Sequence, residues 1–371
     1  MDKTLVDEHP PLEAEIRRRI AAAGPMPVAE YMALCLTDSE HGYYTTRDPF
    51  GARGDFITAP EVSQMFGEMI GLWMAAVWKR MGSPANLRVI ELGPGRGTMM
   101  KDALRAAKVM PGFREAIVMH LVEISPALVA QQERTLEHLA TPMYWHPALI
   151  EVPQGPAIIL ANEFFDALPV HQAVRTGHGW HERLIEIDSD GHLAFTVAPD
   201  ALPQFDRLLP PALRQAPAGS IFEWRADTVA MELGRRLARD GGAALVIDYG
   251  HAESAAGDTL QAVGQHAYAD PLSAPGSIDL TAHVDFQALA KAVEAMGVNG
   301  FGPLAQSEFL RRLGIETRAA SLKAKAADSA IADIDAALAR LIGEGRIAMG
   351  ALFKAAAFAH PALGVPPGFE G

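Results

Sequence analysis

Short, almost wholly apolar runs alternate with amphipathic stretches along the middle of this 371-residue chain. Such runs are typical of parallel strands buried on both faces, and the stretches between them predict helices that cross from one strand to the next. The predicted strands are LRVIEL (87–92), AIVMHLVE (116–123), PMYW (142–145), AIILAN (157–162) and AALVIDY (243–249). The pattern therefore predicts an α/β fold with a doubly wound sheet and right-handed crossovers.

The N-terminal part of the chain has the periodicity of helices instead. Two helices are predicted over residues 12–37, and a third begins at Thr58 and continues to about residue 80. Thr58 and Glu61 have the spacing of a capping box, and Pro60 stands in the first turn. We therefore expect the third helix to run without a break from this cap.

The connection between the fourth and fifth strands is too long for a simple crossover, at about 80 residues. Polar and apolar residues alternate around Asp190 and Gly191, which predicts a hairpin, and a proline-rich stretch follows. We expect residues 171–222 to form an insertion and residues 228–242 to be the helix that returns to the sheet. After the fifth strand, the pattern predicts a helix, a strand, two helices and a last strand, which closes the sheet.

A glycine-rich loop joins the first predicted strand to the helix after it, in the sequence ELGPGRGT. Gly93, Gly95 and Gly97 let a ligand approach the main chain, and the helix that follows presents free N–H groups. Thr98 stands where a phosphate-binding P-loop or a dinucleotide fingerprint requires a glycine or another small residue. Glu91 before the loop suits a ligand with positive charge, such as an amino group or a sulfonium. The alternative is a tight turn that binds nothing.

A second acid is expected beside this loop. Glu123 ends the second predicted strand, and neighbouring parallel strands end at the same edge of a sheet. A carboxylate in this place can accept hydrogen bonds from both hydroxyls of a ribose. Alternatively, Glu123 is an ordinary surface acid at the end of a strand.

These segments resemble a known family. VIELGPGRGTMMKDAL with LVEISP resembles the S-adenosylmethionine site of class I methyltransferases, and GYYTTRDPFGARGDFITAPEVSQMFGE, ANEFFDALPVHQ, VIDYGH and DLTAHVDF add a resemblance to the MidA family over about residues 12–358. The resemblance implies a seven-stranded, Rossmann-like sheet in a methyltransferase domain (85–371), preceded by an N-terminal helical cap and a lid loop (1–84). It also implies S-adenosylmethionine as the cofactor, held in part by Glu91 and Glu123.

The same resemblance implies a substrate. The MidA family includes a mitochondrial complex I assembly factor that dimethylates an arginine on a core complex I subunit. By this resemblance, the partner of the present chain is the bacterial equivalent of the subunit that faces the quinone site. Two alternatives stay open. One is another substrate, such as a small amine, a hydroxyl or a nucleic acid, although the net charge argues against a nucleic acid; the other is an assembly chaperone that keeps the fold without turnover.

The end of the fourth predicted strand supplies the candidate catalytic residues. Methyl transfer is an in-line displacement, so the protein must align donor and acceptor and remove a proton. Asn162 can accept a hydrogen bond from a substrate nitrogen, and His171 is a candidate proton acceptor. Glu163 and Asp166, three residues apart, converge on a guanidinium if a helical turn begins here. Their alternative roles are a loop acid and a helix cap.

Further residues are candidates for binding the substrate. Phe164 and Phe165 can stack on a planar cation, or they belong to the core. Asp248 and Tyr249 end the fifth strand. Either they line the site together with the end of the fourth strand, or they simply terminate their own strand. His283 is a second candidate proton acceptor.

The loop before Thr58 is a candidate lid. Its glycines allow it to fold over the donor with Asp55 and Thr58 facing inwards, although a static connection is an equal alternative.

Composition narrows the partners and the compartment. With 32 basic and 45 acidic residues the net charge is −13, which opposes nucleic-acid binding and favours a cationic partner. The single cysteine, Cys35, excludes an internal disulfide, and the histidine spacing indicates no metal. No apolar run is long enough to span a bilayer, and the N-terminus lacks the features of a targeting signal. We therefore expect no membrane insertion and a cytoplasmic location.

Overall fold

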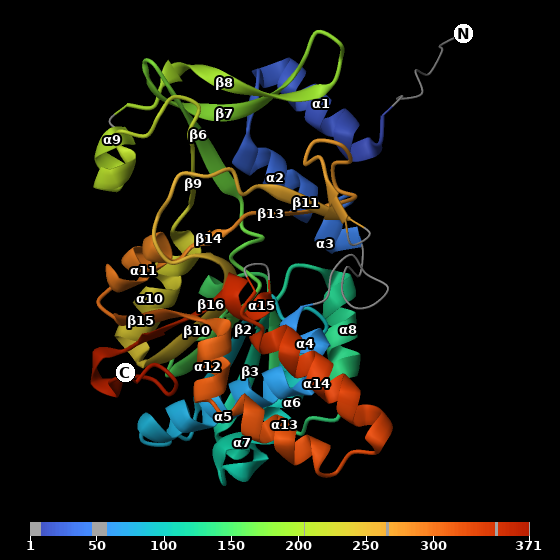
Figure 1. The fold of residues 1–371 in the computed structure, drawn as a ribbon, viewed down its shortest axis with the longest axis vertical. Coiled ribbons are helices and arrows are strands. Elements are labelled where there is room, and N and C mark those ends of the chain that lie inside the picture. The colour runs from blue at the N-terminus through green and yellow to red at the C-terminus, as the bar shows by residue number, and fades with distance from the viewer. Residues whose placement is uncertain (1–8, 47–57, 204, 265–266, 346–347, 371) are drawn as a thin grey trace.

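The computed structural model describes residues 9–46, 58–203, 205–264, 267–345 and 348–370. Figure 1 shows two layers: a helix-flanked central sheet below and a smaller group of strands and helices above it. We call the upper group the cap. Its helices are α1 (Pro11–Ala23), α2 (Val28–Thr37), α3 (Tyr43–Thr46) and α9 (Phe205–Leu208), and its strands are β6 (Val170–Thr176), β7 (Gly179–Ile187), β8 (Leu193–Ala201), β9 (Ile221–Arg225), β11 (Gln261–Gly264), β12 (Ala267–Ala269) and β13 (Asp279–Thr281).

The central sheet contains every strand that the apolar runs predict. Its order is β15 (Asn299–Ala305), β16 (Phe353–Ala359), β10 (Gly242–His251), β5 (Ala157–Asn162), β2 (Leu87–Leu92), β3 (Ile117–Val122) and β4 (Met143–His146). β16 is antiparallel to both of its neighbours, whereas all neighbouring pairs from β10 to β4 are parallel. A two-residue strand, β14 (Val284–Asp285), pairs with the end of β10, so in the described residues the sheet has the seven strands of this order and β14 beside them. The fold is α/β, with a mixed parallel and antiparallel central sheet.

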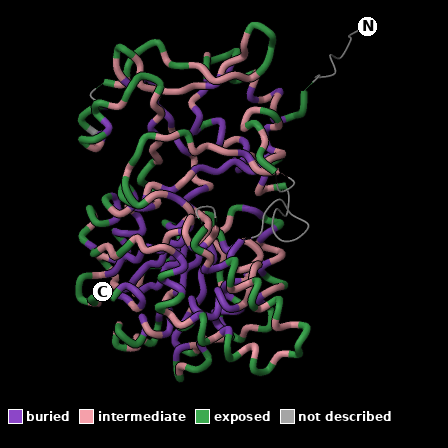
Figure 2. The backbone as a smooth tube through the Cα atoms, viewed as in Figure 1, coloured by how far each residue is buried: buried purple, intermediate pink, exposed green. Residues whose placement is uncertain are grey.

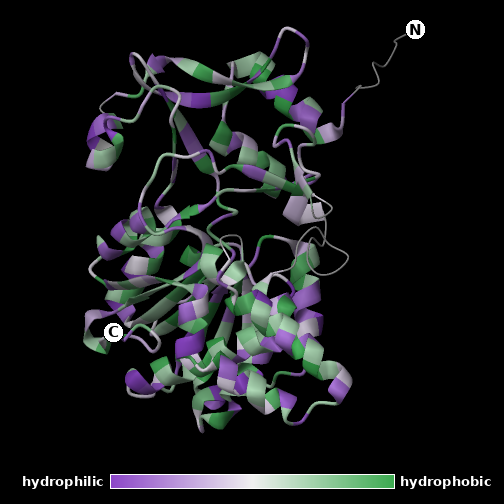
Figure 3. Ribbon diagram, viewed as in Figure 1, coloured by the Kyte–Doolittle hydropathy of each residue, from purple (hydrophilic) through white to green (hydrophobic). Residues whose placement is uncertain are grey.

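Helices cover both faces of this sheet and bury its strands. α5 (Gln64–Arg80) and α6 (Thr98–Ala106) pack on one face, and α10 (Thr228–Asp240) and α11 (Phe286–Glu294) pack on the other. Successive side chains of a strand point to opposite faces, so Val89 and Ile90 of β2 enter different cores. The buried and hydrophobic positions of the lower layer follow these strands in Figures 2 and 3.

The cap differs from the predicted N-terminal helical cap, because three distant segments build it. Its core joins α1 and α2 to the insertion and to the segment around Leu280. β1 (Met26–Pro27) pairs with β7, so that Met26 lies opposite Ile185. α1 and α2 therefore bury their apolar residues against the insertion and this later segment as well as against each other.

The insertion is a sheet rather than a single hairpin. The predicted turn at Asp190 and Gly191 joins β7 to β8, and β6 and β9 complete the sheet. The strands are β6 (Val170–Thr176), β7 (Gly179–Ile187), β8 (Leu193–Ala201) and β9 (Ile221–Arg225). Together with β11 (Gln261–Gly264), β12 (Ala267–Ala269) and β13 (Asp279–Thr281), they place the cap above the carboxyl ends of the central strands.

The predicted boundary at residue 84 does not match the packing. α5 lies before this boundary, yet it contributes Phe66, Met69 and Trp73 to the core of the central sheet. Its amphipathic pattern showed that it packs on something, but the pattern did not show on which partner.

The predicted capping box is wrong. α4 (Ala59–Val62) ends after one turn, and α5 begins after Ser63, whose hydroxyl accepts a hydrogen bond from the amide of Met65. Thr58 precedes α4 without a side-chain cap. Glu61 instead accepts a hydrogen bond from the hydroxyl of Thr98 at 2.6 Å, which joins α4 to the helix after the glycine loop.

The remaining helices lie mainly in the C-terminal half. They are α7 (Phe113–Ala116), α8 (Pro126–Leu136), α12 (Gln306–Arg312), α13 (Ile315–Lys323), α14 (Asp328–Ile342) and α15 (Met349–Leu352). In the part of the chain that the structure describes, none of the helices has both the length and the hydrophobicity that a bilayer span requires.

Candidate active site

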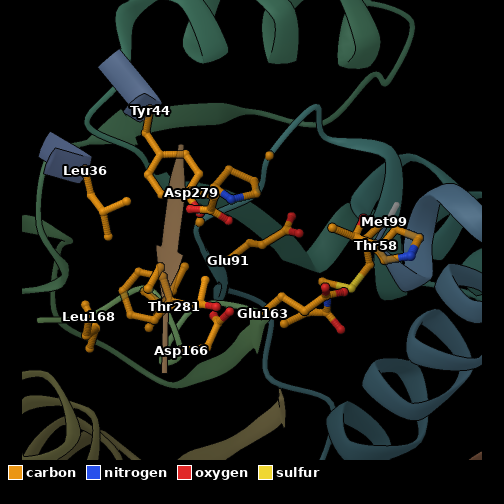
Figure 4. A pocket seen from close by; sticks show the side chains of 18 of the residues that line it. Leu36, Tyr44, Thr58, Glu91, Met99, Glu163, Asp166, Leu168, Asp279 and Thr281 are labelled. Carbon is orange, nitrogen blue, oxygen red and sulfur yellow. The ribbon is translucent and has the colours of Figure 1, made fainter. Parts of the chain in front are cut away.

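A cavity of about 560 Å³ lies between the cap and the carboxyl ends of the central strands. The glycine loop, the end of β3 and the turn after β5 line it from below. Residues of α2, α3, β11 and β13 line it from the cap. Figure 4 shows that side chains from both layers point into the same space.

The glycines of the loop have backbone angles that require glycine. Gly93, Gly95 and Gly97 have φ of 62°, 53° and 77°, in the left-handed region. A Cβ on Gly93 would also lie 3.0 Å from the ring of Phe164, and Gly97 directly precedes α6. The first glycine therefore serves both the turn and the close packing beneath it.

Glu91 is buried in the lining with one oxygen free. The residue is 2% exposed, and its Oε2 has no hydrogen-bond partner among the described residues. Burial raises the pKa of this carboxyl to about 8. Buried polar atoms are nearly always paired, so an oxygen free in this way is typical of a site that receives its partner from a ligand.

Glu123 is held beside the glycine loop, as predicted from the ends of the first two strands. Its Oε1 accepts a hydrogen bond from the amide of Ser125 at 2.8 Å, and its Oε2 accepts one from Gln132 at 3.1 Å. The same amide group of Gln132 donates to the carbonyl of Gly95 at 2.7 Å, and Trp145 donates to the Gln132 oxygen at 2.8 Å. Gln132 thus ties the loop to Glu123.

Gln132 was not identified from the sequence. It lies on the predicted helix beside Gln131, and nothing in the helical pattern tells the two apart. Only the folded structure shows that Gln132 is fully buried, with Gly95, Glu123 and Trp145 as its hydrogen-bond partners.

The turn after β5 places two acids in the cavity without a helix. Glu163 has φ of 50°, which is uncommon for a residue with a side chain. Its Oε1 accepts hydrogen bonds from the amide of Ala59 and from Asn162 Nδ2, both at 3.1 Å. Asn162 Oδ1 is buried and has no partner among the described residues. The helical turn that would let Glu163 and Asp166 converge does not form here, although Asn162, Glu163 and Asp166 all line the cavity.

Burial changes the protonation of these acids. It raises the pKa of Glu163 to about 8, and nearby Asp166 adds to the effect. Burial also raises the pKa of Asp166, which is 5% exposed and keeps Oδ1 without a partner among the described residues.

Asp248 is a support for this turn and does not line the cavity. Its Oδ2 accepts hydrogen bonds from the amides of Phe164, Phe165 and Asp166 at 3.0–3.2 Å. Its Oδ1 accepts one from the amide of Tyr249 at 2.9 Å. The structure therefore does not give Asp248 the substrate contact predicted for it, because all of its bonds are to the backbone and it is fully buried.

The two phenylalanines have different positions. Phe165 is 3% exposed and belongs to the core shared with α10 and α11, so it does not line the active-site cavity. Phe164 lines the cavity and packs under Gly93.

The structure brings His283 to the cavity and leaves His171 outside it. His171 Nδ1 lies 2.8 Å from Glu182 Oε1, and its ring stacks on Trp224 with 5.1 Å between centroids. His283 lines the cavity with its ring against Tyr249, which also lines it. Burial lowers the pKa of His283, so the imidazole is neutral at neutral pH. The turn between β5 and β6 separates His171 from the acids that precede it in sequence.

The candidate lid is only partly described. Thr58 lines the cavity, as predicted. Asp55 lies outside the described residues.

The cap supplies site residues that sequence reasoning missed. Tyr44 on α3 donates a hydrogen bond to Asp279 Oδ1 at 3.0 Å, and Asp279 is 4% exposed. Thr281, two residues later on β13, also lines the cavity. The segment DLTAHVDF contains Asp279 and Thr281, but only the fold places it above a strand end some 120 residues away in sequence. Among the described residues, no group of three or more metal-ligating side chains forms.

Comparison with known proteins agrees with this geometry. A family model described as "Putative S-adenosyl-L-methionine-dependent methyltransferase" matches residues 69–304. The chain belongs to this methyltransferase family. The resemblance found in the sequence is thereby confirmed, and S-adenosylmethionine is the cofactor.

Relatives and solved structures extend the match over most of the methyltransferase. The Drosophila melanogaster protein named "Protein arginine methyltransferase NDUFAF7 homolog, mitochondrial" is 41% identical over 86% of this chain and 78% of its own length. The Homo sapiens protein named "Protein arginine methyltransferase NDUFAF7, mitochondrial" is 38% identical over 83% and 74%. A crystal structure of a Burkholderia thailandensis protein bound to S-adenosyl-homocysteine is 32% identical, with a TM-score of 0.84, over 97% of this chain and 92% of that one.

The expected cytoplasmic location is contradicted by these names. The relatives from Drosophila melanogaster, Danio rerio and Homo sapiens are all named as mitochondrial. A single cysteine indicates a compartment in which thiols stay reduced, and composition does not distinguish one such compartment from another.

The residues of the methyltransferase fit its cofactor. The glycine loop leaves the backbone open to close approach, Glu123 stands where it can accept hydrogen bonds from a ribose, and the free oxygen of Glu91 suits a positive charge. When bound, S-adenosylmethionine supplies an electrophilic methyl group.

Proposed function

We propose that this methyltransferase acts on a side-chain nitrogen of an arginine in a protein. The observation that supports the proposal is the set of carboxyl groups facing one cavity, of which Glu91, Glu163, Asp166 and Asp279 are labelled in Figure 4. An arginine keeps its charge in proteins, and its planar fork pairs with carboxylates. A cavity of this kind attracts a guanidinium and disfavours an anionic acceptor.

In this proposal, one group of residues binds the donor and another binds the arginine. Glu91, the three loop glycines and Glu123 hold the donor. Asp166 and Asp279, which approach from the sheet and from the cap, bind the guanidinium between them. Both groups lie where the cap covers the strand ends.

Glu163 and Asn162 orient the nitrogen that reacts. Asn162 Oδ1 accepts a hydrogen bond from an N–H of the guanidinium and thereby turns the lone pair of the nitrogen towards the methyl group. As the nitrogen gains the methyl group, it loses a proton, and Glu163 accepts it. A pKa of about 8 suits this role, because a general base is most effective when its pKa lies near the working pH. His283 is the second candidate acceptor.

The names of the relatives support an arginine in a protein as the acceptor. The resemblance to the MidA family supports the finer proposal that the substrate is the complex I core subunit facing the quinone site. The net charge of −13 suits a cationic partner. For the catalytic core, we propose a seven-stranded class I sheet with the insertion after its fourth strand and with β14 as an appendage of β10.

The test is to incubate the purified enzyme with S-adenosylmethionine carrying a labelled methyl group and with that complex I subunit. Mass spectrometry then locates the label. Label on an arginine that is lost with the Asp166→Asn variant supports the proposal. Label on a different residue type refutes arginine as the acceptor, and no label on this subunit refutes the finer substrate assignment.

A further inference from the structure

A second hollow, with a volume of about 910 Å³, lies between the cap and the helices α10 and α11. Its cap side is largely aromatic, with Phe205 of α9 and Phe222 and Trp224 of β9. The ring centroids of Phe205 and Trp224 are 4.9 Å apart, so the two rings form a continuous apolar wall. We call this hollow the aromatic groove.

The aromatic groove adjoins the active-site cavity. Leu168 and His283 line both of them, and Val229 faces the cavity while its neighbour Ala230 faces the groove. Arg225 holds this partition in place, because its guanidinium donates to the carbonyls of Leu168 at 3.1 Å and His283 at 2.8 Å. The two spaces are therefore neighbours across a fixed wall of a few residues.

The partition stands at the acceptor end of the cavity. In Figure 4, Leu168 lies on the side of the cavity opposite to Thr58 and Met99, which mark the donor end beside the glycine loop. With the donor at the glycine loop, the arginine enters from the other end. The partition at Leu168 and the groove behind it are then adjacent to the chain that carries the arginine.

We propose that the aromatic groove binds the extended segment of the protein substrate that flanks the methylated arginine, and that it selects an aromatic or aliphatic side chain there. This inference rests on the proposed function. An apolar wall gains most from burying an apolar side chain. The rim of the groove carries both signs of charge, with Arg214 and Asp227, so it does not select a strongly charged segment.

The reach of a peptide limits which positions the groove can recognise. An extended chain advances about 3.3–3.6 Å per residue, so a side chain two to four residues from the arginine lies roughly 7–14 Å along the chain. The selected side chain is expected in this window on one side of the arginine only, because the groove lies on one side of the partition.

The experiment uses fluorescein-labelled nonapeptides with a central arginine in a glycine–serine background. One phenylalanine is placed in turn at each position except that of the arginine. Binding to the full-length enzyme is measured by fluorescence anisotropy with saturating S-adenosylhomocysteine. We expect phenylalanine at one position in the window to tighten binding about tenfold over the glycine–serine peptide. Equal binding of all peptides overturns the proposal.

A bulky residue in the groove gives the second arm. Ala288 is exposed on α11 and lines the groove, so Ala288→Trp fills it without disturbing the core. Ala332, exposed on α14 and outside both spaces, provides the control Ala332→Trp. The tenfold preference should be lost in Ala288→Trp and kept in Ala332→Trp, and its survival in Ala288→Trp also overturns the proposal.

Methyl transfer is measured separately on the same peptides. A binding preference without methylation of the arginine would contradict the proposed function and leave the groove's selectivity standing. Methylation of all peptides without a binding preference would support the function and refute the groove.

Discussion

Glu163 accepts a hydrogen bond from the backbone amide of Ala59 at 3.1 Å, although 104 positions separate the two residues in sequence. The bond joins the turn after β5 to the first residue of α4. Glu61, on the same short helix, is joined to Thr98 beside the glycine loop. The proposed proton acceptor and the donor end of the cavity are therefore linked through one helical turn, and a shift of α4 disturbs both.

The protonation of Glu163 sets the first prediction. Its pKa is about 8, so it is largely protonated at pH 7 and accepts a proton only after it ionises. We expect kcat/KM for an arginine peptide to rise with pH through about 8 in the wild type. In Glu163→Gln, which keeps an oxygen for the Ala59 amide, we expect a loss of 10²–10⁴-fold and no rise in this range.

Glu91 has a similar pKa, and Glu91→Gln is the control for this profile. Glu91 stands at the donor end, so its replacement should weaken donor binding and leave the rise of kcat near pH 8 in place. If the rise disappeared in Glu91→Gln and persisted in Glu163→Gln, our assignment of the proton transfer to Glu163 would be wrong.

Burial of Glu91 predicts that stability depends on pH. The pKa of this carboxyl is about 8 in the folded protein and near 4.5 when exposed, so between these values the unfolded chain ionises while the folded protein keeps the proton. The unfolded state then binds fewer protons, and stability falls as pH rises, by up to about 1.4 kcal/mol per pH unit. Glu91→Gln lacks this loss.

We therefore expect the melting temperature of Glu91→Gln to exceed that of the wild type by an amount that grows from pH 4.5 to pH 8. Thermal unfolding without ligand, at several pH values, measures it. A constant difference across this range would show that Glu91 is not buried as a carboxylic acid. The same variant should bind S-adenosylmethionine more weakly, so the residue trades stability for binding.

Asp248 predicts a different type of defect. Asp248→Asn keeps the size of the side chain, but it replaces one carboxylate oxygen with a donor facing backbone N–H groups. One buried unsatisfied group costs about 1–3 kcal/mol, and the turn that carries Glu163 and Asp166 loses its support. We expect a lower melting temperature together with a lower kcat, whereas Phe165→Leu should lower the melting temperature with less effect on kcat. An unchanged kcat in Asp248→Asn would contradict this positioning role.

Asp279 tests the part of the site that comes from the cap. We expect Asp279→Asn to raise KM for an arginine peptide about tenfold, because it removes a charge-assisted bond to the guanidinium. Tyr44→Phe removes only the hydroxyl that donates to Asp279 and should have a smaller effect. Isothermal titration should show unchanged affinity for S-adenosylhomocysteine in both variants. A loss of donor affinity equal to the rise in KM would place Asp279 at the donor instead.

The sequence was sufficient for the central sheet and for predicting that the glycine loop and Glu123 lie side by side. Buried parallel strands leave a distinct signal of short apolar runs, and Glu91, the glycines and Glu123 follow directly from the ends of two such strands. The loop sequence also excluded a phosphate-binding P-loop, because Thr98 stands where that loop requires a glycine. These features depend on residues close together in sequence, so a single sequence is enough to predict them.

The acceptor end depended on contacts that local sequence does not display. Tyr44 and Asp279 stand 235 residues apart and meet only when the cap assembles. His171 follows Asp166 closely in sequence, yet the strand β6 carries it away to Glu182. Asp248 was recognised as important, but its role as a backbone acceptor follows from where the turn of Phe164 lies.

The close packing under the glycine loop gives the last prediction. In Gly93→Ala, the left-handed backbone costs roughly 1–2 kcal/mol, and the new methyl group lies 3.0 Å from the ring of Phe164. Gly191→Ala has the same type of backbone strain at φ of 83° with nothing within 4 Å, so it isolates the strain from the contact. We expect both variants to lose stability, and only Gly93→Ala to lose more than tenfold in affinity for S-adenosylhomocysteine.

A double variant separates the contact with Phe164 from the backbone strain at the loop itself. Phe164→Leu shortens the ring, so the double variant Gly93→Ala/Phe164→Leu should recover part of the donor affinity, whereas Phe164→Leu alone should not improve it. A double-mutant cycle measures this coupling, which for residues in contact is typically about 0.5–3 kcal/mol. Additive effects would mean that Phe164 yields freely to the new methyl group, and the requirement for glycine at position 93 would then come from the backbone angle and the approach of the donor alone.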